Sequence, residues 1–161
     1  MSSTDTTGET DENLIRLRAA ETALNNGRLA EAEAICLAME GDDRQRAGAA
    51  NILGVIARRR DDLETALTQF RRAGDLDNQT AGYFVNQGRT LIALKRPREA
   101  VVPLRRAVAL RPHSGEANHN LGNALRLAGD MGGALRHYQL AATAEPPPIQ
   151  ALADLGTLLI S

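Results

Sequence analysis

The side chains that could carry out catalysis or bind a metal are few in this 161-residue chain, and their spacing does not gather them. His113, His119 and His137 fall at different positions of the regular pattern described below, so we expect them to face different ways. A zinc site needs histidines and cysteines at short spacings, which are absent. Cys36 is the single cysteine and is interpreted as a small buried apolar residue. With no phosphate loop, dinucleotide fingerprint or nucleophile elbow, the sequence predicts no catalytic site, metal or cofactor.

Asparagines and arginines instead recur at spacings of i, i+4 and i+7, which place them along one face of a helix. The three rows are Asn51, Val55 and Arg58; Val85, Arg89 and Ile92; and His119, Asn123 and Arg126, with Asn86 and Asn120 beside the last two. Asparagine carries both donors and an acceptor, so a ladder of asparagines can hold the main chain of an extended peptide. The sequence predicts a peptide-binding surface made of Asn51, Arg58, Asn86, Arg89, His119, Asn120, Asn123 and Arg126. The arginines would add a preference for acidic side chains.

A simpler interpretation of these asparagines is open as well. The ladder consists of two asparagines 34 residues apart, Asn86 and Asn120. The corresponding positions of the neighbouring repeats hold Ile52 and Asp154 instead. Asparagine is also a tolerated polar residue on any solvated helix face, so the pattern fits both a binding ladder and an ordinary wet surface.

The helices that would position these residues are indicated by a spacing of 34 residues that recurs without insertion. Glycines keep this spacing, and so do small residues, turn residues and larger residues. The columns are Gly54, Gly88, Gly122 and Gly156; Ala32, Ala66, Ala100 and Ala134; Ala73, Ala107 and Ala141; Gly27, Asp61, Lys95 and Gly129; and Cys36, Phe70, Leu104 and Tyr138. Apolar residues at helical spacing lie on both sides of each turn, which predicts one pair of helices per repeat. We interpret the small residues as helix-crossing points and the larger column as filling the gap between repeats.

This pattern closely resembles the tetratricopeptide repeat (TPR) family, over roughly residues 13–161. The resemblance implies an all-α fold, a right-handed helical-repeat solenoid of about four helix-turn-helix units plus one C-terminal helix. The implied units are 13–46, 47–80, 81–114 and 115–148, followed by a partial unit at 149–161. We expect nine helices and no sheet. Residues 1–12 are acidic and almost without apolar side chains, and we expect them to be disordered.

The family resemblance also bears on function, because the units look most like those of bacterial proteins and of O-linked N-acetylglucosamine transferases. The segment from Glu116 to Leu125 carries that second likeness, and in those enzymes an asparagine ladder binds peptide substrates. The TPR groove that clamps the carboxylate of chaperone tails needs cations where this chain has Asn51 and Glu116. The resemblance therefore implies a protein-protein interaction module that binds an extended peptide or a partner helix in a concave groove, and disfavours a chaperone-tail adaptor.

Composition limits the classes of partner. With 43% hydrophobic and 24% charged residues, the chain has the composition of a soluble globular protein. A net charge of −1 and 2% aromatic residues offer little to a nucleic acid, which needs cations for its backbone and rings for its bases. The start of the chain does not read as a secretory signal, and no apolar run is long enough to span a membrane. We therefore expect a cytoplasmic protein with a protein or peptide ligand.

The C-terminal stretch keeps a second functional class open. Residues 149–161 hold Leu152, Leu155, Leu158, Leu159 and Ile160, and the repeat pattern stops there before a second helix. We expect these residues to drive self-association through 149–161, or else the end to fray in a protein that is natively longer. In the second case the chain would be the N-terminal substrate-docking region of a longer glycosyltransferase or sulfotransferase, and only then part of an enzyme.

Overall fold

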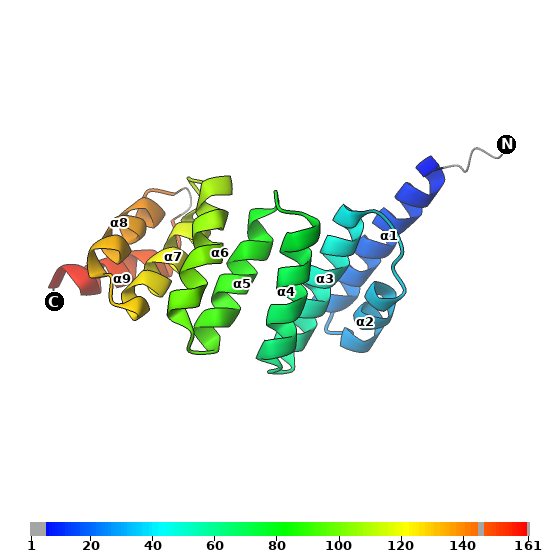
Figure 1. Cartoon of the computed structure of the whole chain (residues 1–161), viewed down its shortest axis with the longest axis horizontal. Coiled ribbons are helices and arrows are strands. Elements are labelled where there is room, and N and C mark those ends of the chain that lie inside the picture. The colour runs from blue at the N-terminus through cyan, green and yellow to red at the C-terminus, as the bar shows by residue number, and fades with distance from the viewer. Residues whose placement is uncertain (1–5, 145–146, 161) are drawn as a thin grey trace. The chain divides into compact units, whose positions relative to one another are not determined.

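A computed structural model describes residues 6–144 and 147–160, and within them the chain forms nine α-helices and no strand (Figure 1). The all-α helical-repeat fold expected from the sequence is confirmed. The helices are α1 (Thr6–Asn25), α2 (Leu29–Leu37), α3 (Asp43–Arg59), α4 (Leu63–Leu76), α5 (Ala81–Ala93), α6 (Pro97–Leu110), α7 (Gly115–Ala128), α8 (Met131–Ala142) and α9 (Ile149–Ile160). They belong to two compact units, Met1–Asn78 and Gln79–Ser161, which are described separately below.

Helix α1 begins before residue 13, where the first unit of the sequence repeat begins. It begins at Thr6, inside the acidic segment 1–12 that we expected to be disordered, while residues 1–5 lie outside the described residues. Glu12 forms an ion pair of 2.6 Å with Arg16 one turn later. Acidic residues near the beginning of a helix also favour the helical form, because they lie close to the positive end of its dipole. The helix therefore continues into residues that the repeat pattern did not include.

The turn column of the sequence corresponds to a shared backbone conformation. Gly27, Asp61, Lys95 and Gly129 have φ angles of 76°, 63°, 61° and 95°, which is the left-handed region. This conformation reverses the chain between the two helices of a pair. In all four places it is followed by a backbone hydrogen bond to a carbonyl in the last turn of the preceding helix, such as Asp130 N to Leu125 O at 2.9 Å. Each helix pair therefore closes through the same turn.

The glycine column marks the closest approach of the two helices in each pair. A Cβ atom added at Gly54 would lie 2.6 Å from the Phe70 ring, and one added at Gly122 would lie 2.6 Å from the Tyr138 ring. Gly88 is covered in the same way by Leu104. We expected these larger residues to fill the gap between repeats. Each of the three also lies on the glycine of its own pair, because the missing side chain leaves room for a ring or a leucine.

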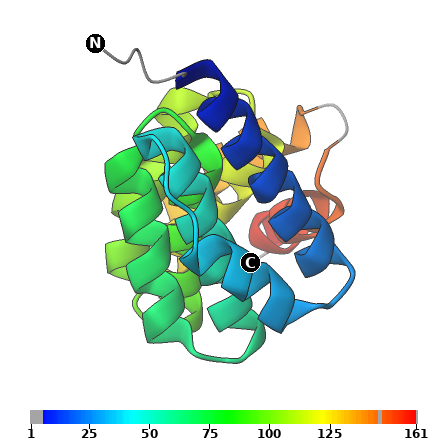
Figure 2. The same ribbon diagram turned by 90° about the vertical axis from the view of Figure 1, so that its right-hand side faces the viewer.

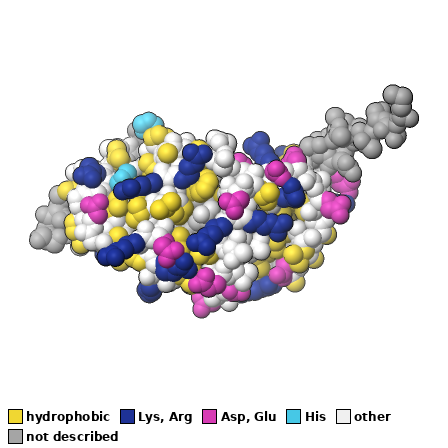
Figure 3. All heavy atoms as spheres, in the orientation of Figure 1, with side chains coloured by type: hydrophobic (Ala, Val, Ile, Leu, Met, Phe, Trp, Pro, Cys, Tyr) yellow, Lys and Arg dark blue, Asp and Glu magenta, His cyan; other side chains and the backbone are white. Residues whose placement is uncertain are grey.

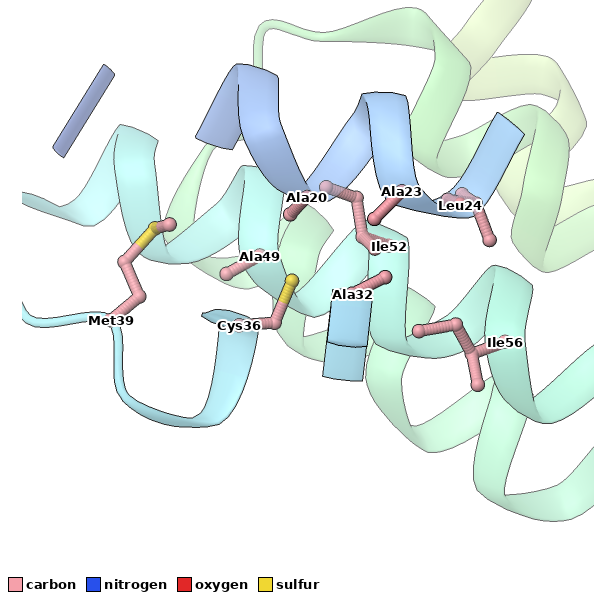
Figure 4. Close-up of a cluster of buried hydrophobic side chains, with 9 residues drawn as sticks. All are labelled: Ala20, Ala23, Leu24, Ala32, Cys36, Met39, Ala49, Ile52 and Ile56. Carbon is pink, nitrogen blue, oxygen red and sulfur yellow. The ribbon is translucent and has the colours of Figure 1, made fainter. Parts of the chain in front are cut away.

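The first unit has its core between α1, α2 and α3, which pack against one another (Figures 1 and 2). Figure 4 shows the buried side chains of this cluster: Ala20, Ala23, Leu24, Ala32, Cys36, Met39, Ala49, Ile52 and Ile56. Two arginines at the end of α3 reinforce the contact. Arg59 Nη1 donates to the Leu24 carbonyl at 2.7 Å, and Arg60 forms a two-pronged pair with Glu33 at 2.7 and 2.9 Å. This pairing lowers the pKa of the Glu33 carboxyl.

The second unit is organised around α7, which packs against α5, α6, α8 and α9. Its N-terminal turn is fixed by a residue that the sequence does not mark as structural. This residue is Asn118, which is fully buried. Its Nδ2 donates to the carbonyls of Pro112 and Ser114 at 2.8 and 3.0 Å. The amide thus ties the loop that follows α6 to the start of α7, and α5 and α7 come to lie next to each other.

Candidate functional site

An open depression with a volume of about 340 Å³ lies on the second unit, along α5 and α7. Its lining combines two cations, two amides and two aliphatic side chains: Arg89, Ile92, Asn120, Asn123, Arg126 and Leu127. Four of these six are among the binding residues predicted from the sequence. Leu127 is 49% exposed, so an aliphatic surface is accessible beside the polar side chains. A surface that is both polar and apolar suits a ligand with both kinds of group.

The cation on α5 is already partly engaged within the unit. Arg89 Nη1 lies 3.5 Å from Glu116 Oε1 on α7, and both side chains are largely exposed. A pair of this kind contributes little to stability and can be broken by a competing anion. Asn120 is held by its own helix, because its Nδ2 donates to the Glu116 carbonyl at 2.8 Å. One donor of the predicted ladder is therefore used inside α7.

The cation on α7 is held in place by a tyrosine. Arg126 Nε donates to the Tyr138 hydroxyl at 3.2 Å, and that hydroxyl donates to Asn123 Oδ1 at 2.7 Å. Tyr138 is fully buried, and its burial raises the pKa of the hydroxyl, which Arg126 lowers to a smaller extent. The phenol therefore keeps its proton and remains a donor to Asn123. Arg126 and Asn123 are thus positioned by one buried side chain of α8.

His119 connects this group of residues to the last helix. Its Nε2 lies 2.8 Å from Asp154 Oδ2 on α9, and its ring lies 5.8 Å from the Tyr138 ring. From the sequence we expected Asp154 to interrupt the asparagine ladder. In the structure this carboxylate forms a polar contact between α9 and α7. His119 is only 14% exposed, so it is a supporting residue more than a surface residue.

The remaining predicted binding residues lie elsewhere. Asn51 and Arg58 are half-buried on α3 in the first unit, where the Arg58 guanidinium lies over the Phe70 ring at 5.7 Å. This is a cation-π contact that stabilises the pair α3 and α4. Asn86 is half-buried on α5 in the second unit. The structure thus brings together Arg89, Asn120, Asn123 and Arg126 along the depression, with His119 behind them.

The other titratable residues singled out in the sequence have structural contacts. His137 Nδ1 lies 3.0 Å from Asn118 Oδ1, and burial, followed by the nearby Arg136 and Arg105, lowers its pKa. Burial raises the pKa of the Cys36 thiol to about 11, which leaves it an unreactive core residue. Within the described residues no group of three or more His, Cys, Asp or Glu is placed to hold a metal ion.

Three contributors to the site were not recognised from the sequence: Leu127, Tyr138 and Asp154. Leu127 is an apolar residue on the polar face of its helix, directly after Arg126. This feature of the sequence could have indicated that it belongs to the surface. Tyr138 was assigned to packing alone, since nothing in the repeat pattern predicts a partner for its hydroxyl. Asp154 could not be paired with His119 without knowing how α9 packs on α7. Of the apolar residues expected to drive self-association, the side chains of Leu152, Leu158, Leu159 and Ile160 lie outside the described residues.

The wider surface gives no sign of an extended basic area on the face that Figure 3 shows. Basic and acidic side chains are interspersed on it, with hydrophobic atoms visible between them (Figure 3). None of the described helices is both long enough and apolar enough to cross a membrane.

Residues 85–148 match the family model for the tetratricopeptide repeat. They span most of α5 through α8 and include the whole depression. No curated protein matches the chain. Several solved structures share its fold. The first TPR of Spaghetti (RPAP3), solved with the HSP90 peptide SRMEEVD, is 21% identical with a TM-score of 0.70, over 74% of this chain and 98% of that one.

Two other structures cover more of the chain. MamA from Desulfovibrio magneticus RS-1, from residue 41 to its end, is 18% identical with a TM-score of 0.76, over 99% of this chain and 86% of that one. A chain of the APC/C hetero-tetramer Cut9-Hcn1 is 21% identical with a TM-score of 0.77, over 91% of this chain and 30% of that one. At these identities the likeness is one of fold. The match to the tetratricopeptide repeat family itself covers residues 85–148, which is less than half of the chain.

Proposed function

We propose that the protein is a protein-protein interaction module whose second unit binds an extended peptide segment of a partner along α5 and α7. The observation that carries this proposal is the depression itself, where Arg89, Asn120, Asn123 and Arg126 lie beside two accessible aliphatic side chains. Amides suit the peptide main chain, while Ile92 and Leu127 suit apolar side chains of the ligand.

Shape and chemistry both favour a peptide over a small molecule. The depression is open along its length, whereas sites for small ligands usually enclose most of the ligand surface. The Spaghetti TPR, which has the same fold, was solved with a bound peptide, and this supports the class of ligand proposed here.

The sequence of the bound peptide should differ from a chaperone tail. Glu116 lies beside the depression and forms an ion pair with Arg89, so a negative side chain is present where a tail-clamping groove needs a cation. We expect a ligand whose anionic group reaches Arg126 rather than the Glu116 end of α7. We propose that Asn123 and Arg126 contact the ligand at the Arg126 end of α7, in place of the predicted asparagine ladder.

The experiment is a selection of display-library peptides on the intact chain, followed by fluorescence anisotropy with the best binder. Arg89→Ala and Arg126→Ala should each weaken binding by up to about fivefold, because an ion pair at an exposed site contributes roughly 0.2–1 kcal/mol. The matched control is Arg98→Ala, which removes an exposed arginine of α6 in the same unit. Equal losses in all three variants, or no loss in any, would place the peptide elsewhere and refute the proposal.

A further inference from the structure

The hydrogen bonds around Tyr138 have only one consistent direction, and that direction limits what the depression can bind. Arginine has donors and no acceptor, so the contact from Arg126 Nε requires the Tyr138 oxygen to accept. The hydroxyl proton is then left for Asn123, 2.7 Å away, which must present its oxygen. The orientation of the Asn123 amide therefore follows from the network, with Oδ1 toward Tyr138 and the NH₂ group on the other side.

The NH₂ group of Asn123 lies 3.4 Å from His119 Nε2. That nitrogen also lies 2.8 Å from Asp154 Oδ2, and an ionised carboxylate only accepts. Nε2 therefore carries the hydrogen that it donates to Asp154 and has no lone pair for Asn123. The His119 ring therefore offers no acceptor to the Asn123 NH₂ group, which is left as a donor on a residue that lines the depression.

Arg126 adds donors on the same side. One of its N–H groups is held by Tyr138, and the rest of the guanidinium lies at the exposed edge of the depression. Among the described residues Arg126 forms no ion pair, in contrast to Arg89, which is paired with Glu116. Asn123 and Arg126 are three residues apart on α7 and are fixed by the same hydroxyl. Together they form a site composed only of donors.

We infer that Asn123 and Arg126 bind a carboxylate side chain of the peptide, an aspartate or glutamate within the segment, and discriminate against its amide counterpart. This inference rests on the proposed function, since it names the group that the same depression recognises. A carboxylate offers two acceptor oxygens to the donors of Asn123 and Arg126 and matches the charge of the guanidinium. A glutamine side chain would turn its own NH₂ group toward one of these donors. The aliphatic side chains of Ile92 and Leu127 suit apolar residues next to the acidic one.

The test uses two acetylated, C-terminally amidated pentapeptides that differ in one side chain, Gly-Leu-Glu-Leu-Gly and Gly-Leu-Gln-Leu-Gly. Both are titrated into the isotope-labelled intact chain, and the side-chain amide signal of Asn123 is followed by NMR. The Glu peptide should bind about tenfold more tightly than the Gln peptide, the factor expected for hydrogen bonds to a charged group. A third probe, the Gln peptide with a free C-terminal carboxylate, should bind more weakly than the amidated Glu peptide. Tighter binding by that third probe would assign the site to a chain terminus and overturn the inference.

Two variants separate this site from general electrostatics. Asn123→Asp replaces the NH₂ donor by an acceptor in nearly the same shape and should remove most of the affinity for the Glu peptide. The matched control is Asn120→Asp, which makes the same change of charge in the same depression and should have the smaller effect. Tyr138→Phe keeps the ring that covers Gly122 but frees the Asn123 amide to turn. In this variant the ratio of Glu to Gln affinity should fall, which a loss of packing alone would not cause.

The outcomes also separate this inference from the proposed function. Equal affinities of the Glu and Gln peptides, equal effects of the two Asp variants, or no shift with either probe would each overturn the carboxylate site. The proposed function would still stand if display-selected peptides bind and depend on Arg89 and Arg126. If the binding of no selected peptide depends on Arg89 and Arg126, both the carboxylate site and the proposed function are refuted.

Discussion

Single residues of this protein are under specific backbone constraints, and the turn residue Lys95 is the clearest case. Its φ angle is 61°, a region that costs a residue with a side chain roughly 1–2 kcal/mol. Lys95→Gly should therefore raise the free energy of unfolding by about 0.5–1 kcal/mol, after the greater freedom of glycine in the unfolded chain is subtracted. Chemical denaturation checks this. Gly129→Ala is the reverse change at the corresponding turn of the next helix pair, where φ is 95°, and it should destabilise.

Packing at the glycine column constrains single residues as strongly. The Cβ of an alanine at position 122 would lie 2.6 Å from the Tyr138 ring and 3.3 Å from the Ala134 carbonyl oxygen. We expect Gly122→Ala to destabilise by about 1–3 kcal/mol, and Gly122→Leu by more, since either must displace the ring. Gly82 in α5 has no atom within 4 Å of the same position, so Gly82→Ala should be neutral or stabilising. Thermal unfolding of the three variants tests these expected changes in stability. Similar melting temperatures for Gly122→Leu and the parent protein would contradict the assigned packing.

At the scale of elements, the start of α7 depends on a buried amide and a histidine of α8. His137 lies 3.0 Å from Asn118, and its lowered pKa means that the unfolded chain, near the ordinary value of 6.5, binds a proton more readily than the folded chain. The contribution of this site is therefore complete above pH 6.5 and is lost as the pH falls through the lowered pKa. His137→Gln should flatten the acid side of the stability profile, measured by denaturant unfolding at a series of pH values. His113→Gln, which removes an exposed histidine, is the control and should keep the parental slope.

The helices themselves could be predicted from the sequence because the repeat of 34 residues places the same four kinds of residue in the second, third and fourth pairs, while the first pair has Ala20 and Met39 at two of these positions. The structure explains the turn column, because all four of its residues have the left-handed backbone conformation. The start of α1 could not be predicted, since the repeat pattern does not reach it. The contacts of Phe70, Leu104 and Tyr138 with the glycine of their own pair could not be predicted, because the spacing alone does not say which side chain covers a glycine. Cys36, in the same column, packs with Ala49 and Ile52 of the next pair, as expected.

The proposed binding surface was predictable only in part for a related reason. Helical spacing identified Arg89, Asn123 and Arg126 as residues of one face, and they line the depression. What spacing cannot give is the direction of a hydrogen bond. The role of Tyr138 depends on a contact between two helices, and the pairing of His119 with Asp154 depends on the packing of α9. Asn51 and Arg58 followed the same spacing but lie in the other unit, where Arg58 contacts Phe70.

At the scale of the whole molecule, the central claim is that a partner peptide lies along α5 and α7. The most direct measurement is photo-crosslinking of the display-selected peptide to the intact chain carrying benzoylphenylalanine at one position. Placed at Ile92, which lines the depression, the crosslinker should capture the peptide, and excess unlabelled peptide should compete. Placed at Val102, which is 74% exposed on α6, it should capture little. Strong competed crosslinking at position 102 and none at position 92 would contradict the account.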